Sequence, residues 1–305
     1  MIFRHEYPEV LWVDLEQPTE EEIHAIAQEF SISERLEKEM LSPTPTSLVT
    51  REGDKTLLVL HFPAHGAEDR MTKNQEVDFI VGDDFILTVR YEVVAPLHHL
   101  QKLLETQKIV SKRIALTTDV LLEILFAHLY RSVHDHTNHV VSRLARIEED
   151  MFDGSERETI LSILQVSREF LHMETALADQ EGPLTRFLAT LADSGAFGAH
   201  FPERTERILA GRSQIARLVE THRAVAAELR ETNVALLESR QNEIIKTLTV
   251  MNFIFLPLGL ITWTFAMRTE GTPLIDSPNS FWIVVGAMAV LGLSLTLFVA
   301  RKRWI

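Results

Sequence analysis

The stretch that decides the fold is Lys246-TLTVMNFIFLPLGLITWTFAM-Arg268, followed by a polar loop and by Phe281-WIVVGAMAVLGLSLTLFV-Ala300. Twenty-one residues between Lys246 and Arg268 carry no charge, and Phe281 to Ala300 gives twenty more. A helix of about 20 residues crosses the roughly 30 Å hydrocarbon core of a bilayer. The sequence therefore predicts two transmembrane helices, 247–268 and 281–300, joined by an external loop at 269–280.

The charges beside these segments predict their orientation. The tail at 301–305 carries three positive charges, whereas the other side has only Arg268, at the end of the first span, against Glu270 and Asp276 in the loop. Positive residues mark the cytoplasmic side of a membrane protein. The N-terminal residues MIFRHEYPEV lack the apolar segment of a signal peptide. We therefore expect an inner-membrane protein with both chain ends in the cytoplasm.

Composition limits the possible functions. The formal net charge is −14, and because residues 247–305 carry +2, the first 246 residues carry −16. An acidic chain disfavours nucleic acid as a partner and favours cations. The absence of cysteine excludes disulfides, thiolate metal sites and a cysteine nucleophile. The sequence also lacks P-loop, HExxH and GxSxG motifs, so we expect no enzyme activity and no cofactor.

Residues 1–200 are predicted to form a cytoplasmic α/β domain with an antiparallel sheet. Leu11–Leu15 is expected to be the first strand, and Thr19 with Glu22 fits the capping box that begins a helix. Further strands are expected at 47–51, 55–62, 76–81 and 85–91. Helical periodicity then covers 96–110, 117–152 and 156–181, with a loop predicted at Glu181-Gly182-Pro183.

The next segment, 201–246, is predicted to be a long stalk helix that continues into the first transmembrane helix. It has Pro202 at its start and no later proline before the membrane. Its apolar residues recur on one side, and we expect packing against other copies of the chain to bury them. This stripe consists of Ile208, Ile215, Leu218, Val225, Leu229 and Leu236.

A pore requires several copies of the chain, because two spans cannot enclose a hydrated path. The first span is the better candidate for its lining, since its polar and small residues recur on one side. Asn252 is informative because an amide facing lipid is costly. It faces either water or a neighbouring helix, where a hydrogen bond would need no ion. The predicted lining residues are Asn242, Ile245, Leu248, Asn252, Leu256, Gly259 and Trp263.

The chain resembles the CorA family of magnesium transporters along nearly its whole length. The resemblance rests on residues 242–249 (NEIIKTLT), 255–258 (FLPL), the basic end at 302–305 (KRWI), 11–22 (LWVDLEQPTEEE) and 77–90 (VDFIVGDDFILTVR). It implies a homopentameric funnel with a cytoplasmic α/β domain, an α-helical stalk, a pore lined by the first transmembrane helix, and the second transmembrane helix outside it.

The expected selectivity mouth departs from this family. The resemblance implies Gly-Met-Asn at the end of the first span, whereas this chain has Ala266, Met267 and Arg268, with Glu270 and Asp276 nearby. Hydrated Mg²⁺ presents water hydrogens that need acceptors, and arginine offers only donors. We expect a pore that conducts without the family's usual magnesium selectivity.

The regulatory site that the resemblance implies is also altered. Family members close when Mg²⁺ binds aspartates, one of which lies on the stalk helix. This chain has no aspartate between Asp193 and Asp276. Glutamates could substitute for it, but Arg204, Arg207 and Arg212 make this stretch of the stalk basic. We therefore expect no magnesium gate of the family's kind.

Histidines on the helix at 117–152 form a weaker candidate site. His134, His136 and His139 lie around Asp135, and imidazole and carboxylate groups at such spacing can bind Zn²⁺. The same residues also fit a solvated helix face.

The leading functional hypothesis is a homo-oligomeric CorA-like channel that conducts cations passively across the bilayer. The alternatives are a weakly selective or tension-gated ion channel, and a non-conducting membrane-anchored scaffold.

Overall fold

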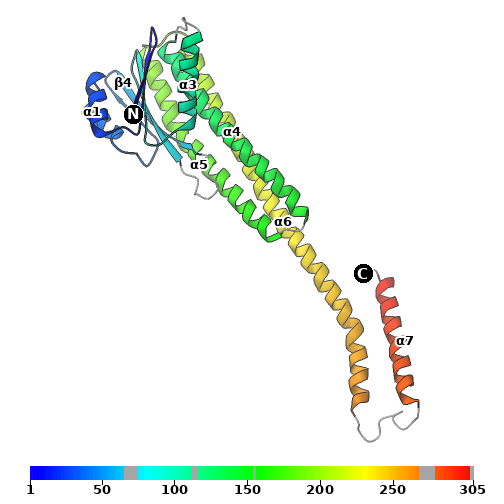
Figure 1. Ribbon diagram of the computed structural model, residues 1–305. Helices are drawn as coiled ribbons and strands as arrows, with labels where there is room; N and C mark the ends of the chain where they lie inside the picture. Colours follow the sequence, from blue (N-terminus) through cyan, green and yellow to red (C-terminus); the bar gives the residue numbers. More distant parts are fainter. Residues whose placement is uncertain (65–73, 111–115, 154–155, 268–278, 303–305) are drawn as a thin grey trace. The chain divides into compact units, whose positions relative to one another are not determined.

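The structure is a computed structural model that describes residues 1–64, 74–110, 116–153, 156–267 and 279–302 (Figure 1). The chain divides into two compact units, Met1–Arg230 and Glu231–Ile305. The boundary falls within the long helix α6, Phe201–Ala266, so this helix contributes residues to both units.

The first unit is built on a six-stranded sheet with the order β1-β2-β6-β5-β4-β3. All neighbouring strands are antiparallel except β2 and β6, which are parallel. The strands are β1 (Ile2–Glu6), β2 (Leu11–Glu16), β3 (Leu48–Glu52), β4 (Lys55–Pro63), β5 (Asn74–Val81) and β6 (Phe85–Arg90).

The predicted antiparallel sheet is therefore confirmed except at one pair, β2 with β6, which is parallel. After β2 the chain passes through α1 (Glu20–Glu29) and α2 (Glu34–Met40), and β3 then forms the far edge of the sheet. The hairpins from β3 to β6 lead back across the sheet and place β6 beside β2 in the same direction. Strand β1 was not predicted from the sequence.

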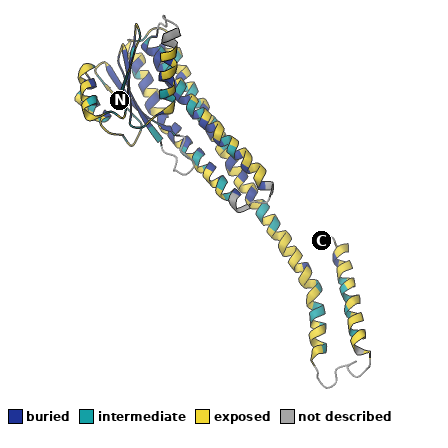
Figure 2. Ribbon diagram, in the orientation of Figure 1, coloured by how far each residue is buried: buried dark blue, intermediate teal, exposed yellow. Residues whose placement is uncertain are grey.

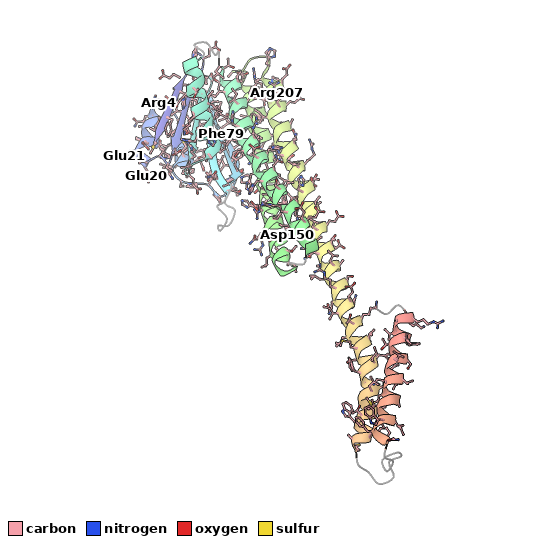
Figure 3. All side chains as sticks on the ribbon, turned by 45° about the vertical axis from the view of Figure 1, so that its right-hand side comes forward. Arg4, Glu20, Glu21, Phe79, Asp150 and Arg207 are labelled. Carbon is pink, nitrogen blue, oxygen red and sulfur yellow. The ribbon has the colours of Figure 1, made fainter. Side chains whose placement is uncertain are left out.

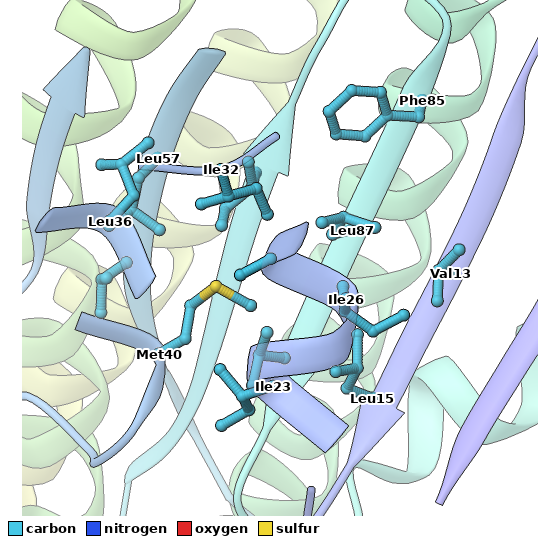
Figure 4. Close-up of a cluster of buried hydrophobic side chains, with 14 residues drawn as sticks. Val13, Leu15, Ile23, Ile26, Ile32, Leu36, Met40, Leu57, Phe85 and Leu87 are labelled. Atoms are coloured by element: carbon cyan, nitrogen blue, oxygen red, sulfur yellow. The ribbon is translucent and has the colours of Figure 1, made fainter. Parts of the chain in front are cut away.

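Helices α1 and α2 cover one face of the sheet. Ile23, Ile26, Leu36 and Met40 pack there with strand residues such as Leu87 to form a buried core (Figure 4). The start of α1 confirms the capping box, because the Thr19 hydroxyl accepts from the Glu22 N–H and the Glu22 carboxylate accepts from the Thr19 N–H.

Long helices cover the opposite face. They are α3 (Ala95–Val110), α4 (Thr118–Asp153) and α5 (Glu156–Ser194). The Phe79 ring of β5, labelled in Figure 3, stacks on Phe126 of α4 with centroids 5.0 Å apart. Because both faces are covered, β4 and β6 are buried along nearly their whole length.

Helix α5 continues through the predicted loop at Glu181-Gly182-Pro183. The helix continues here because residues on both sides of Pro183 are buried. Gln180 is fully buried, donates to the His61 carbonyl at 2.7 Å and accepts from the Tyr130 hydroxyl at 2.9 Å, while Leu184 is also fully buried. These tertiary contacts outweigh the backbone hydrogen bond that proline cannot make.

The α6 stripe is largely buried within a single chain, which corrects the expectation that copies of the chain are needed. Ile208, Ile215 and Leu229 are all less than 9% exposed, whereas Val225 remains exposed. Figure 2 shows buried residues in the bundle that α4, α5 and this part of α6 form. Helices α4 and α5 provide the partners: Arg212 of α6, for example, donates to the Leu177 carbonyl of α5 at 2.6 Å. The antiparallel packing of α4 and α5 could not be read from the periodicity of α6 alone.

The second unit contains the end of α6 and helix α7 (Ser280–Arg301). Both helices are long and apolar enough to cross a membrane, and only 6% of the most apolar stretch of each is buried. They are the two candidate membrane helices.

Candidate functional site

Within the second unit, α6 packs against α7 along one side. Val250 and Val299 are almost fully buried, and the rings of Phe253 and Phe298 lie 6.3 Å apart. The Thr262 hydroxyl lies 3.7 Å from the Met288 sulfur. The half-buried residues that continue this side of α6 are Ile254, Leu258, Ile261 and Phe265.

The predicted lining residues occupy the other side of α6. Leu248, Leu256 and Trp263 are 58%, 65% and 69% exposed, and Asn252 is exposed as well. Asn252 is two residues before Ile254, which places it about 200° around the helix from the side that contacts α7. We call the surface made by Asn242, Ile245, Leu248, Asn252, Leu256, Gly259 and Trp263 the open face of α6.

The structure describes the start of the open face and only part of the predicted selectivity mouth at its end. Asn242 and Ile245 are exposed near its start, and Ala266 and Met267 are exposed at its end. The Met267 N–H still donates to the Trp263 carbonyl at 3.2 Å. The rest of the predicted selectivity mouth, Arg268, Glu270 and Asp276, lies outside the described residues.

The tryptophan on the open face lies over a glycine. A Cβ built on Gly259 would meet the Trp263 ring at 3.9 Å, so the indole extends back along the helix by about one turn. Gly259 leaves lateral space beside that ring because it has no side chain.

The three candidate metal-binding histidines point into different surroundings. His136 is buried, and its Nε2 lies 3.0 Å from a Glu169 oxygen on α5. His134 is half-buried and contacts the Asn138 amide at 3.2 Å, whereas His139 is exposed. Within the described ranges no group of three or more histidine, aspartate and glutamate residues is arranged to hold a metal ion. The zinc site is therefore not supported, because successive helical positions turn away from one another.

The arginines of the stalk bind carboxylates of the same chain. Arg204 Nε lies 2.8 Å from Asp119 Oδ2, and Arg204 also contacts Glu123 at 2.7 Å. Arg207, labelled in Figure 3, makes two hydrogen bonds to Glu123, at 2.6 and 3.0 Å. The hydrogen bond from Arg207 lowers the pKa of Glu123, and burial opposes this effect. This cluster was not predicted from the sequence, although Asp119 and Glu123 have the i,i+4 spacing of one helix face.

A cavity of about 440 Å³ lies beside this cluster, between α4 and α6. Its apolar wall includes Ala127, Ile208 and Ile215, and Gly211 leaves it open. Glu123 and Arg207 stand at its edge and neutralise each other.

The α/β domain contains a fully buried carboxyl group that the sequence analysis also missed. Asp78 accepts a hydrogen bond from the Tyr91 hydroxyl at 3.0 Å. Burial, followed by the nearby charge of Glu76, raises the pKa of Asp78 well above its ordinary value. Glu76 in turn accepts from the Thr44 N–H at 2.9 Å and lies 3.4 Å from His61 Nε2.

Comparison with known proteins gives one consistent result. The model of a family described as "CorA-like Mg2+ transporter protein" matches residues 8–302. The cobalt/magnesium transport protein CorA of Methanocaldococcus jannaschii is 22% identical over 97% of this chain and 92% of its own length. The magnesium transport protein CorA of Mannheimia succiniciproducens is 23% identical, with the same two coverages.

Solved structures show the same fold. The complete structure of the CorA magnesium transporter from M. jannaschii superposes with a TM-score of 0.84 at 20% identity, covering 99% of this chain and 93% of that one. The full-length CmaX protein gives a TM-score of 0.63 at 16% identity, covering 98% of this chain and 90% of the other.

Proposed function

This chain belongs to the CorA family of Mg²⁺ transporter proteins, and from that premise we propose that it is a channel that conducts cations passively through a pore on the axis of its oligomer. Its relatives named above are described as transporters of magnesium or of cobalt and magnesium. The observation that carries the proposal is the open face of α6, which α7 leaves uncovered along the membrane segment.

An oligomer explains why that face is left uncovered. By family resemblance the assembly is a homopentamer, in which five open faces would surround one axis. Asn252 then faces water or a neighbouring copy rather than lipid, where an amide would lack hydrogen-bond partners. Helix α7 lies against the opposite side of α6 and would form the outer, lipid-facing ring.

The same proposal assigns the parts of the chain. Residues 1–200 form a cytoplasmic α/β domain, 201–246 the stalk, 247–268 and 281–300 the two membrane spans, and 269–280 the external loop. The basic tail at 301–305 lies in the cytoplasm, as its charge favours.

We further propose that cytoplasmic Mg²⁺ does not close this channel. Arg204 and Arg207 bring positive charge to the segment of the stalk where the family resemblance implies an aspartate. These guanidinium groups also occupy two carboxylates of α4, those of Asp119 and Glu123. Currents from reconstituted channels should therefore be unchanged when millimolar Mg²⁺ is added on the cytoplasmic side.

The pore lining can be tested with single cysteines, because the natural chain has none. Asn252→Cys and Leu256→Cys lie on the open face, whereas Leu258→Cys and Ile261→Cys face α7. In planar bilayers, a positively charged methanethiosulfonate reagent should block current through the first pair and leave the second pair unaffected. Val290→Cys, an exposed position on α7, serves as the lipid-facing control.

Two outcomes would reject the proposal. Block at the positions that face α7, with none at the open face, would assign the pore to another surface. The protein would be a scaffold instead if neither the wild type nor Leu256→Cys, each purified as an intact oligomer, passed current with any ion or under any membrane tension.

A further inference from the structure

Trp263 presents the bulkiest side chain on the open face of α6. Its indole is 69% exposed in the single chain, and Gly259 beneath it contributes no side chain. The ring is therefore free on the side away from α7. Its importance rests on the proposed conduction path, because only that path would bring several copies of the ring together.

The position of Asn252 fixes the direction in which Trp263 points. The two residues are eleven positions apart, which is close to three full helical turns, so their side chains leave α6 within about 20° of each other. Any rotation of the helix that keeps the Asn252 amide out of lipid also turns Trp263 away from lipid.

A second tryptophan fits the ordinary interfacial role better. Trp282 lies at the start of α7, is 71% exposed, and packs edge-on against Phe281 at 5.4 Å. Aromatic residues at such positions anchor a span at the membrane surface. Trp263 lies on the side of α6 opposite the contact with α7, so the same explanation does not extend to it.

We propose that the Trp263 indoles form the constriction of the pore and make it prefer weakly hydrated monovalent cations, such as K⁺, to Mg²⁺. An indole offers a negative ring face and one N–H donor, but no acceptor for the hydrogens of bound water. Mg²⁺ keeps its water shell and therefore gains little from this ring. A monovalent cation that sheds water at lower cost can contact the ring faces directly.

Gly259 sets how far each ring reaches toward the axis. The 3.9 Å distance from a Cβ at this position is ordinary van der Waals contact, so alanine fits beneath the ring. The branched side chain of valine would place further atoms against the indole and push it toward the axis. Gly259→Val should therefore narrow the pore only while Trp263 is present.

The test is single-channel recording with K⁺ on one side of a planar bilayer and Mg²⁺ on the other. Trp263→Ala should increase the permeability of Mg²⁺ relative to K⁺ by about threefold or more, the size of one cation–π contact. Trp263→Phe keeps an aromatic face and should retain the wild-type preference. Trp282→Ala is the matched control and should change neither conductance nor selectivity.

Combining Gly259→Val with Trp263→Ala shows whether the effect of valine acts through the Trp263 ring or through a general disturbance of the helix. Gly259→Val should lower the conductance of the wild-type background and have little effect on Trp263→Ala. Size-exclusion elution of each variant at the wild-type volume shows that the oligomer is intact.

The outcomes distinguish this inference from the proposed function. Wild-type current with unchanged selectivity in Trp263→Ala, or an equal change in Trp282→Ala, overturns the role of Trp263 and leaves the channel proposal standing. Current that appears only in Trp263→Ala overturns the proposed preference for K⁺, because the rings would then close the pore to every ion. Silence in every variant rejects both proposals.

Discussion

The parallel pair β2 and β6 is joined by an ion pair that has no contact with water. Arg90 and Asp14 are both fully buried. Arg90 donates to Asp14 Oδ2 from Nε at 3.0 Å and from a terminal nitrogen at 2.8 Å. Thr88 and Gln101 donate to the same carboxylate, each at 2.5 Å. We expect this network to fix the pairing that the sequence analysis missed.

Replacing Arg90 with methionine tests this expectation. The variant keeps an apolar chain of similar length but leaves the Asp14 charge buried without its cation. Breaking one partner of a buried pair costs about 3–5 kcal/mol of unfolding free energy. For a domain of this size, that corresponds to a fall in Tm of about 10 °C. Arg90 also pairs with Glu16 at 2.7 Å, but the Glu16 side chain is 15% exposed. Adding Asp14→Leu removes the one stranded charge that is fully buried and should recover about half of the loss or more.

The molecule contains a fluorescent reporter of this network. Trp12 is fully buried, and its Nε1 donates to the Thr88 hydroxyl at 3.0 Å. Phenylalanine at 263, 282 and 304 leaves Trp12 as the single tryptophan, and thermal unfolding in detergent can then be followed by its emission. A fall in Tm of less than about 3 °C, or a double variant less stable than Arg90→Met, would refute the reasoning.

Three further predictions follow from single positions. Because the pKa of Asp78 is raised, the folded state keeps a proton that the unfolded state releases, and the stability of the wild type should fall as pH rises above the ordinary carboxyl pKa. Asp78→Asn should flatten this fall when Tm is measured from pH 5 to pH 8. Equal slopes of Tm against pH in the two proteins would contradict this. A Cβ on Gly292 would lie 3.5 Å from Leu258, so Gly292→Ala should be tolerated. Gly292→Leu should lower the unfolding free energy by about 1–3 kcal/mol in detergent. Leu258→Ala should restore part of that loss in the same assay. Gly211 lies inside α6 with open space at its Cβ, so Gly211→Ala should raise stability by about 0.5–1 kcal/mol in the same assay, and a loss would show that the helix needs glycine there.

The sequence predicted local features well because their causes are local. The capping box of Thr19 and Glu22 depends on residues three positions apart, and the strand at Phe85–Arg90 on a short apolar run. The loop predicted at Pro183 failed for the opposite reason. Its helix is maintained by Gln180 bonding to His61, which lies 119 residues away in the sequence.

For the open face of α6, too, some features follow from the local sequence and others only from tertiary packing. Helical periodicity placed Asn252, Leu256 and Trp263 on one side of a predicted span, and the family resemblance implied that this side lines a pore. Only the packing of α7 against Val250, Leu258 and Thr262 showed which side of α6 a single chain leaves uncovered.

The sequence by itself determined two membrane spans, because an uncharged run of about 20 residues has the length of a bilayer core whatever surrounds it. Tertiary structure alone decided the parallel pairing of β2 with β6, the pairing of the stalk arginines with Asp119 and Glu123, and the side of α6 that faces away from α7. These depend on contacts between residues distant in sequence, whose geometry no local pattern of charge or hydrophobicity contains.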